Sequence, residues 1–254
     1  MSLISIITPC FNSVDTINDT ITSVLNQSYT NWEIIICDDM SNDKSESIIN
    51  KFDDPRIKYV KNEFIKGAAG SRNTAMKYAS GRFICFLDSD DIWSKHKLEI
   101  QLKFMQKYDL AFTYGSYYTF KNNIKNITGK FSPKPYLSFA DILKTCDIGC
   151  LTVMIDREKT GNFSFPYSEK EDYALWLILF RKNNIKARLY PGIHAYYRIS
   201  SKGISANKFN EIKKQYNVLN KYSNCNKISI CIYLFHYGIN GLIKYFLKYR
   251  LKKI

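Results

Sequence analysis

The first 115 residues alternate between two hydrophobic patterns. Continuously apolar runs predict buried strands, whereas apolar residues at every third or fourth position predict helices. Strands are expected at residues 3–8, 32–37, 57–60, 82–87 and 110–114, and helices at residues 17–25, 41–52, 67–79 and 95–108. This alternation is typical of an α/β fold, in which helices cover both faces of a parallel sheet.

The second half of the chain is less regular. Residues 122–135 are rich in Asn, Lys and Pro and predict a loop suited to cover a cleft. Further elements are expected as a strand at 152–155, a buried helix at 168–181, extended chain at 188–198, and helices at 208–222 and 228–250. We expect one domain with two halves, residues 1–115 and 116–205, followed by a helical basic tail at 206–254.

Polar side chains gather where three of the predicted strands end. They are Thr8 and Asn12 after the first strand, Asp38 and Asp39 after the second, and Asp88, Asp90 and Asp91 after the fourth. Each group alone could be a turn or a helix cap. Ligands of open α/β sheets bind outside the carboxyl ends of the strands, so three such groups on neighbouring strands favour a binding site.

The third group places three carboxylates within four residues. Neighbouring carboxylates raise one another's pKa unless a cation neutralises them. Oxygen ligands on a short loop suit Mg²⁺ or Mn²⁺, which also bind phosphate. This segment alone leaves a second interpretation open, an Asp-rich turn leading into a helix capped by Asp91 or Ser94. Residues 67–70 lack the dinucleotide-binding spacing and the chain has no P-loop, so a bound nucleotide diphosphate would need a metal to neutralise it.

The composition is that of a folded globular protein, with 45% hydrophobic and 15% aromatic residues in 254. Seven scattered cysteines, none in a Cys-x-x-Cys pair, and three histidines argue against a zinc site and indicate a reducing, cytoplasmic environment. Residues 1–7 have neither the basic segment nor the long apolar run of a signal peptide, and are expected to lead into the first strand.

The net charge of +14 is unevenly distributed. The balance is −3 over residues 1–100, +7 over 101–200 and +10 over 201–254, which argues against a nucleic-acid-binding protein and indicates a tail that meets an anionic partner. The apolar run 228–243 is shorter than the ~20 residues that span a bilayer. A helix lying on an anionic membrane surface is favoured over a packed helix with a solvated basic end. The basic residues that follow the run are Lys244, Lys248, Arg250, Lys252 and Lys253, of which Lys244, Lys248 and Lys252 would share a helix face.

Five segments carry a family resemblance. Residues 8–12 (TPCFN), 38–43 (DDMSND), 71–73 (SRN), 88–91 (DSDD) and 171–176 (EDYALW) resemble, in this order, the motif set of the family 2 inverting glycosyltransferases. The resemblance spans roughly residues 1–200. It implies a GT-A fold, which is a Rossmann-like, mostly parallel sheet flanked by helices, here with a C-terminal helical basic extension.

The resemblance implies a UDP-sugar donor in the first half of the chain and an acceptor in the second. Asp39 would accept a hydrogen bond from the uracil N3–H, with Thr8 and Pro9 lining the base, and Arg72 would contact the base or a phosphate. Asp88 would face the ribose and, with Asp90, hold Mn²⁺ or Mg²⁺, which stabilises the UDP leaving group. The implied nucleotide-sugar site comprises Thr8, Pro9, Asn12, Asp39, Arg72, Asp88 and Ser89.

Asp172 would be the general base that takes the proton of the acceptor hydroxyl. Direct displacement inverts the anomeric centre, so an α-linked UDP-sugar would give a β-glycoside. Acceptor contacts are expected from Asp91, Glu171, Trp176 and Arg198. The alternatives are a capping box between Ser168 and Glu171, a core position for Trp176 and a surface salt bridge for Arg198. His194 could be an additional metal or phosphate ligand, but a structural role is favoured.

Two departures from the family pattern stand out. Met40 follows Asp38 and Asp39 where the family usually has glycine, so the turn at the uracil contact is expected to differ slightly. The Gln-x-x-Arg-Trp signature and transmembrane helices of processive members are absent from the sequence, which favours transfer of one sugar per encounter.

The resemblance and the basic tail together imply a bacterial enzyme on the cytoplasmic face of the inner membrane. It would add one sugar to a polyprenyl-diphosphate-linked oligosaccharide in O-antigen, capsule or lipooligosaccharide biosynthesis. A sugar nucleotidyltransferase is a second hypothesis, although residues 8–15 lack the Gly-rich, basic loop of such enzymes. A non-catalytic GT-A-like scaffold in envelope assembly is the third.

Overall fold

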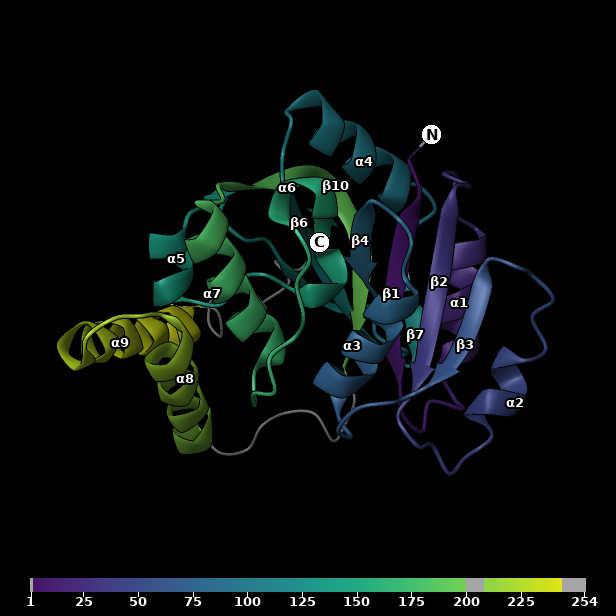
Figure 1. Cartoon of the computed structure of the whole chain (residues 1–254), viewed down its shortest axis with the longest axis horizontal. Coiled ribbons are helices and arrows are strands. Elements are labelled where there is room, and N and C mark those ends of the chain that lie inside the picture. Colours follow the sequence, from purple (N-terminus) through teal and green to yellow (C-terminus); the bar gives the residue numbers. More distant parts are fainter. Residues whose placement is uncertain (1, 200–207, 244–254) are drawn as a thin grey trace.

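Four parallel strands form the first half of the sheet. The computed structural model describes residues 2–199 and 208–243 (Figure 1). These strands are β1 (Ile4–Cys10), β2 (Trp32–Asp38), β3 (Ile57–Lys61) and β4 (Phe83–Phe86). Their spatial order is β3-β2-β1-β4, so the three strands that end in polar groups are neighbours, as predicted.

Helices alternate with these strands as the sequence pattern predicts. They are α1 (Ile17–Leu25), α2 (Ser45–Ile49), α3 (Ala68–Tyr78) and α4 (Lys97–Lys107). Helix α2 is shorter than the predicted span 41–52. Residues 41–44 stay outside the helix, because the side chains of Ser41 and Asp43 accept hydrogen bonds from the backbone of the loop after β1.

The second half extends the same sheet in the order β4-β9-β6-β10-β5, with β7 paired to β6 and β8 to β10. These strands are β5 (Ile92–Trp93), β6 (Phe112–Lys121), β7 (Asn123–Phe131), β8 (Tyr136–Leu137), β9 (Met154–Asp156) and β10 (Ala187–Arg198). Strand β9 is antiparallel to both β4 and β6, whereas β10 is parallel to β6. The α/β fold predicted from the sequence is confirmed.

The loop predicted at residues 122–135 is wrong for most of its length, because residues 123–131 form β7. This strand pairs antiparallel with β6, opposing Tyr117 to Phe131 and Thr119 to Gly129. Backbone hydrogen bonds hold it at the edge of the sheet, where polar and lysine side chains are usual, so its composition resembled that of a loop.

The remaining helices lie mostly on one side of the second half. They are α5 (Phe139–Lys144), the 3₁₀ turn η1 (Cys150–Thr152), α6 (Arg157–Thr160), α7 (Glu171–Asn183), α8 (Lys208–Tyr222) and α9 (Lys227–Ile243). The capping box predicted at Ser168 and Glu171 is wrong, because α7 begins without a side-chain cap. A capping box is present instead at α5, between Ser138 and Asp141.

Two apolar clusters cover the two faces of the sheet. One includes Ile21 of α1 and Leu102 of α4, and the other includes residues of α3 and α7. Trp176 of α7 is fully buried in the second cluster, with its ring centre 5.9 Å from that of Phe86 and 5.1 Å from that of Phe112. The expected contact of Trp176 with an acceptor sugar is therefore wrong, and the core interpretation holds.

No helix within residues 2–199 and 208–243 is both long enough and apolar enough to cross a bilayer. Helices α8 and α9 pack against each other beside α5 and α7 (Figure 1). The expected continuation of the last helix to residue 250 and the shared face of Lys244, Lys248 and Lys252 lie outside the described residues.

Candidate active site

A cavity of about 530 Å³ opens where β1, β2 and β4 end and α3 begins. We call it the donor cavity. Six side chains that the sequence analysis singled out line it: Pro9, Asn12, Asp39, Ser89, Asp90 and Arg198. Thr8 does not, because it lies within β1 and is fully buried, so its expected contact with a base is wrong.

Polar residues after β2 hold the loop that follows β1. Asn12 adopts a left-handed conformation (φ 48°) and donates its backbone N–H to Ser41 Oγ at 3.0 Å. In return, the Asn42 N–H donates to Asn12 Oδ1 at 2.9 Å, and the Val14 N–H donates to Asp43 Oδ2 at 3.0 Å. These bonds fix one wall of the donor cavity and explain why the segment 38–43 is so polar.

Asp39 is held at the cavity wall by two hydrogen bonds. Its Oδ1 accepts from Asn62 Nδ2 at 2.6 Å and its Oδ2 accepts from the Gly67 N–H at 2.8 Å. Gly67 has φ +126°, a conformation that residues with a side chain rarely adopt. Met40 has φ 63° with its side chain exposed, so the turn keeps the backbone shape expected of glycine even though methionine occupies it.

The first turn of α3 supplies the other wall through Gly67, Ala68 and Ser71. A helix N-terminus carries partial positive charge and unpaired N–H groups. An anionic group such as a phosphate is therefore favoured at this end of the cavity.

The side chains of residues 88–91, in the loop after β4, point to different surroundings. Ser89 Oγ lies 2.7 Å from Ser13 Oγ at the cavity, whereas Asp91 is fully buried and its Oδ1 accepts from the Arg198 N–H at 2.9 Å. Asp91 thus anchors the end of β10, and its expected contact with an acceptor is wrong. Burial raises the pKa of Asp90, and the charge of Asp88 raises it further.

The donor set at this loop fits a hard divalent cation. Asp90 and Asp88 offer only oxygen atoms, and a cation would relieve the repulsion that raises the pKa of Asp90. Within the described part of the chain, no three His, Cys, Asp or Glu side chains come close enough to hold a metal ion by themselves. Oxygen atoms of a phosphate and of water would have to complete the coordination shell, as is usual for Mg²⁺.

Arg72 joins the acidic loop to α7. Its Nη2 donates to Asp88 Oδ1 and its Nη1 donates to Glu171 Oε1, both at 2.6 Å. The side chain is only 5% exposed, and Arg72, like Asp88 and Asp172, is not among the residues that line the donor cavity. Its contact with a base or phosphate stays a prediction. Glu171 is the partner of Arg72 rather than of Ser168. The bridge sets α7 beside the loop that carries Asp88 and Asp90.

Asp172 follows Glu171 in the first turn of α7. Its Oδ1 accepts the N–H of Tyr173 at 2.7 Å. Burial raises the pKa of Asp172 to about 6, with the neighbouring charge of Glu171 acting in the same direction and that of Arg72 opposing it. A carboxylate with this pKa is ionised at pH 7 and is basic enough to accept a proton, as a general base must.

Arg198 lines the donor cavity and also forms the salt bridge that was its alternative. Its Nε donates to the carbonyl of Asp90 at 2.8 Å, and its Nη2 lies 3.0 Å from Asp19 Oδ2. Its Nη1 donates to the carbonyl of Asn122 at 2.8 Å. Arg198 therefore ties the acidic loop to α1 and to the β6–β7 turn.

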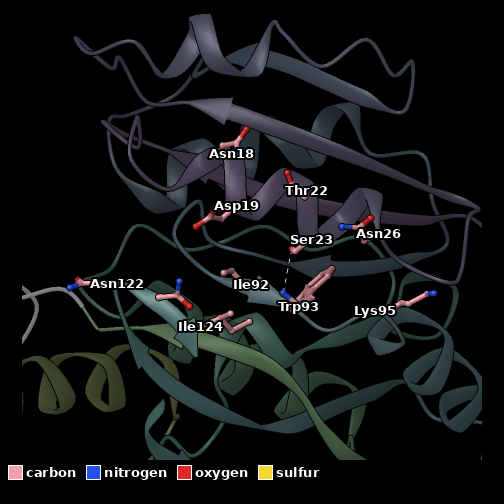
Figure 2. Close-up of a pocket in the computed structure, with 11 residues that line it drawn as sticks. Asn18, Asp19, Thr22, Ser23, Asn26, Ile92, Trp93, Lys95, Asn122 and Ile124 are labelled. Atoms are coloured by element: carbon pink, nitrogen blue, oxygen red, sulfur yellow. Dashed lines mark hydrogen bonds between the residues drawn. The ribbon is translucent and has the colours of Figure 1, made fainter. Parts of the chain in front are cut away.

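Asp19 and Asn122 also line a second groove, of about 630 Å³ (Figure 2). Asn18 and Thr22 of α1, with Asn26 directly after the helix, face Ile92 and Trp93 of β5 across it. The backbone N–H of Trp93 donates to Ser23 Oγ at 3.3 Å, which fixes β5 against α1. This groove holds none of the expected catalytic or metal-binding residues.

Other residues near the site were not expected from the sequence. Phe11 and Ser13 line the donor cavity, and Lys66 Nζ lies 4.4 Å from the centre of the Phe11 ring. Phe11 belongs to the segment 8–12, which could have drawn attention to it, but nothing in the sequence marks Lys66. The Nδ1 atom of His194 lies 2.9 Å from Ser94 Oγ and its ring stacks on Tyr190, contacts that agree with the structural role favoured for this residue.

Comparison with known proteins identifies the family. The model described as Glycosyl transferase family 2 matches residues 5–188. An Escherichia coli protein named UDP-Glc:alpha-D-GlcNAc-diphosphoundecaprenol beta-1,3-glucosyltransferase WfgD is 47% identical over 98% of this chain and 97% of its own length. A second, WfaP, whose name states the same activity, is 48% identical over 100% of this chain and 99% of its own.

Solved structures support the same fold. TarS 1–349 of Staphylococcus aureus in complex with UDP superposes with a TM-score of 0.68 at 18% identity, covering 98% of this chain and 76% of TarS. The mannosyltransferase PcManGT of Pyrobaculum calidifontis, in complex with GDP-Man and Mn²⁺, gives 0.66 at 15% identity, covering 92% and 68%. The fold is thus the expected GT-A type. From the family match and the full-length relatives we conclude that the chain is a glycosyltransferase and belongs to glycosyl transferase family 2.

Proposed function

We propose that this enzyme transfers one glucose from UDP-glucose to the N-acetylglucosamine of a polyprenyl-diphosphate-linked acceptor, with inversion to a β-1,3 linkage. The observation that carries the proposal is the extent of the identity. The two relatives named for this reaction are 47% and 48% identical over 98% and 100% of the chain, and so include the second half that faces the acceptor.

The residues of the site suit the chemistry. Asp172 removes the proton from the acceptor hydroxyl as its oxygen attacks the anomeric carbon, and the bond from that carbon to the UDP oxygen breaks. Attack from the face opposite the leaving group converts an α-linked sugar into a β-glycoside. The Arg72 bridge positions the first turn of α7, and so the base, beside the acidic loop.

The donor cavity provides for both parts of UDP. Pro9, Asn12 and Asp39 would surround the uracil, and the first turn of α3 would favour the diphosphate. Asp90, with Asp88, would hold Mn²⁺ or Mg²⁺, which supplies neutralisation of the diphosphate charge in the leaving group.

We place the reaction at the cytoplasmic face of a bacterial inner membrane, in the synthesis of a surface polysaccharide. The support is the diphosphoundecaprenol in the names of the two relatives, because a polyprenyl chain resides in the bilayer. The excess of 10 positive charges over residues 201–254 agrees with an anionic surface nearby.

The transfer is tested with purified protein, Mn²⁺ and a short-chain lipid that carries α-linked GlcNAc diphosphate. UDP-glucose should add one hexose by mass spectrometry, with a β-linkage at O3 by NMR, while UDP-galactose and UDP-GlcNAc should react far more slowly. Preference for another donor, or another linkage, would refute the proposal. Pyrophosphate release from UTP and a sugar phosphate would support the nucleotidyltransferase hypothesis instead.

The metal assignment has its own test, calorimetric titration of UDP with and without Mn²⁺. The native protein should bind UDP more tightly with Mn²⁺, and Asp90→Ala should lose that gain. Asp53→Ala, which removes an exposed aspartate outside the donor cavity, should behave as native. Equal UDP affinity with and without Mn²⁺ would contradict the metal site.

A further inference from the structure

Helix α9 is apolar on two opposite faces. Its inward face places Ile230, Tyr233 and Leu234 against the core cluster of α7. The opposite face carries Ile228, Ile232, Phe235 and Ile239, which are 76%, 53%, 69% and 40% exposed. Their spacing of four, three and four residues places them in one stripe along the helix. We call these four residues the outer α9 face.

The outer α9 face lacks the polar residues expected of a helix on the surface of a globular protein. No charged residue occurs from 228 to 243. Scattered exposed apolar residues are common, but a contiguous stripe of four large ones marks an interaction surface. The inward face of α9 packs on the core, whereas the described residues of the protein leave the outer α9 face uncovered. We therefore expect a partner outside the described residues to cover that face.

Charge distinguishes the possible occupants of the other face. Lys227 precedes the stripe, and the sequence after residue 243 adds Lys244, Lys248 and three further basic residues. Self-association through this face would bring two strongly basic segments together, which like-charge repulsion opposes. An apolar stripe flanked by cations suits a membrane surface that offers acyl chains beneath anionic headgroups.

We propose that the outer α9 face docks the enzyme on an anionic phospholipid bilayer, with the stripe inserted at the level where headgroups meet acyl chains. The proposal names the surface that would bring the enzyme to a lipid-linked acceptor, and in that respect it rests on the proposed function.

On the side away from the outer α9 face, α8 and α9 contact the start of α7, which carries Asp172. Lys170, which directly precedes Glu171 and Asp172, donates from Nζ to Tyr237 Oη of α9 at 3.1 Å. The same Nζ lies 3.2 Å from Gln215 Oε1 and 3.3 Å from Glu211 Oε2 of α8. Docking of α9 would therefore also fix the start of α7, and with it Asp172, relative to the bilayer surface.

Vesicle flotation tests the docking surface. Native protein should bind vesicles of phosphatidylglycerol and phosphatidylcholine, and the double variant Ile232→Ser/Phe235→Ser should bind at least tenfold more weakly. The matched control is Ile124→Ser, which removes an exposed isoleucine of β7. Equal binding by the double variant and the native protein would overturn the proposal. So would a native dimer, seen by light scattering, that the double variant converts to monomer.

A second variant keeps the test independent of any loss of fold. Phe235→Trp preserves the apolar face, and its added fluorescence should shift to shorter wavelength when phosphatidylglycerol vesicles are added, as an indole does on leaving water. No shift on addition of vesicles that bind the protein would show that α9 stays in water and would overturn the assignment.

The coupling to catalysis is tested by supplying the acceptor in two forms. The double variant should lose at least tenfold in rate on an acceptor embedded in vesicles, and keep the native rate on a short-chain acceptor in buffer. Equal losses on both acceptors would contradict a docking role. If the native protein glycosylates neither acceptor, the proposed function fails, while vesicle binding still decides the docking surface.

Discussion

The carboxylate of Asp172 illustrates how single neighbours set the chemistry of this site. It is half-buried at the start of α7, where loss of solvent contact raises its pKa to about 6, and Glu171 adds a further raising charge. Arg72 acts in the opposite direction, but its guanidinium is shared between Glu171 and Asp88. The pKa of Asp172 thus depends on how closely Arg72 remains paired with Glu171 and Asp88.

The enzyme should therefore lose activity in acid. Below about pH 6 Asp172 is protonated and cannot accept the hydroxyl proton, so kcat/KM should fall by about tenfold per pH unit there. Glu171→Gln removes the raising charge, so the acid limb of the profile should move to lower pH. Above pH 6, Asp172→Asn should lower kcat by about 10²- to 10⁴-fold, and the difference from the native enzyme should narrow in acid, where native Asp172 is itself protonated. An acid limb that does not move in Glu171→Gln would refute the electrostatic effect of Glu171.

Met40 is a second position where one residue has a measurable consequence. It holds a left-handed backbone conformation (φ 63°), which costs a residue with a side chain about 1–2 kcal/mol, and its side chain is 58% exposed. Met40→Gly relieves that strain, and the greater freedom of glycine in the unfolded chain offsets part of the gain. We expect the free energy of unfolding to rise by about 0.5–1 kcal/mol in urea titrations.

Met40→Ala is the matched control for that measurement. Alanine keeps the Cβ atom, and with it the strain, so the free energy of unfolding should stay close to native. A glycine variant no more stable than the alanine variant would show that the turn stores no strain at this residue.

Among the elements, α7 carries the proposed general base and a core residue on adjacent turns. Asp172 lies in its first turn, and Trp176 one turn later is enclosed by the rings of Phe86, Phe112 and Phe165. We expect Trp176→Phe to lower the free energy of unfolding by about 2 kcal/mol, because a smaller ring leaves part of the space empty. KM for the acceptor should stay at its native value. A large rise in that KM with unchanged stability would restore an acceptor role for Trp176.

The elements that the sequence predicted well are those whose pattern is set by burial. Strands β1, β2 and β4 are almost continuously buried and mostly apolar because helices cover both faces of the sheet. That pattern can be recognised in the sequence without knowledge of the neighbouring strands. Strand β7 could not be predicted in this way, because it is held by backbone bonds to β6 and most of its side chains are exposed. Its Asn and Lys residues carry no strand signal.

The same distinction applies to the site. The sequence placed the acidic loop correctly at the end of β4, since strand ends follow from the strands themselves. It could not separate Asp90, which lines the donor cavity, from Asp91, which turns inward to the Arg198 N–H. Nor could it anticipate that Arg72 meets Glu171, 99 residues further along the chain. Side-chain direction on a loop depends on contacts from distant segments that periodicity does not encode.

At the scale of the whole molecule, charge divides the chain into a slightly acidic half that holds the donor cavity and a basic remainder that ends in α8 and α9. The two parts communicate through α7, since Arg72 contacts its first residue and Lys170, directly before it, contacts the C-terminal helices. Lys170 is therefore the residue whose loss should weaken the contact of α8 and α9 with the start of α7.

Lys170→Met removes that cation while keeping an unbranched side chain of similar length. Gln215, which is fully buried, would lose its partner, and Glu211 would keep only Lys214. A lost hydrogen bond at a buried group costs about 1–3 kcal/mol, so α8 and α9 should open more readily than in the native protein. Hydrogen exchange measured by mass spectrometry should become faster in residues 208–243 and stay unchanged in β1, β2 and β4.

Lys213→Met is the matched control, because Lys213 is an exposed lysine of α8. It changes the net charge equally and should leave exchange at the native rate throughout. Faster exchange in β1, β2 and β4 of Lys170→Met would mean that the tail and the sheet unfold as one unit. Unchanged exchange in α8 and α9 would mean that their apolar contacts with α7 suffice. Only selective opening of the two helices fits a tail whose connection to the start of α7 depends on Lys170.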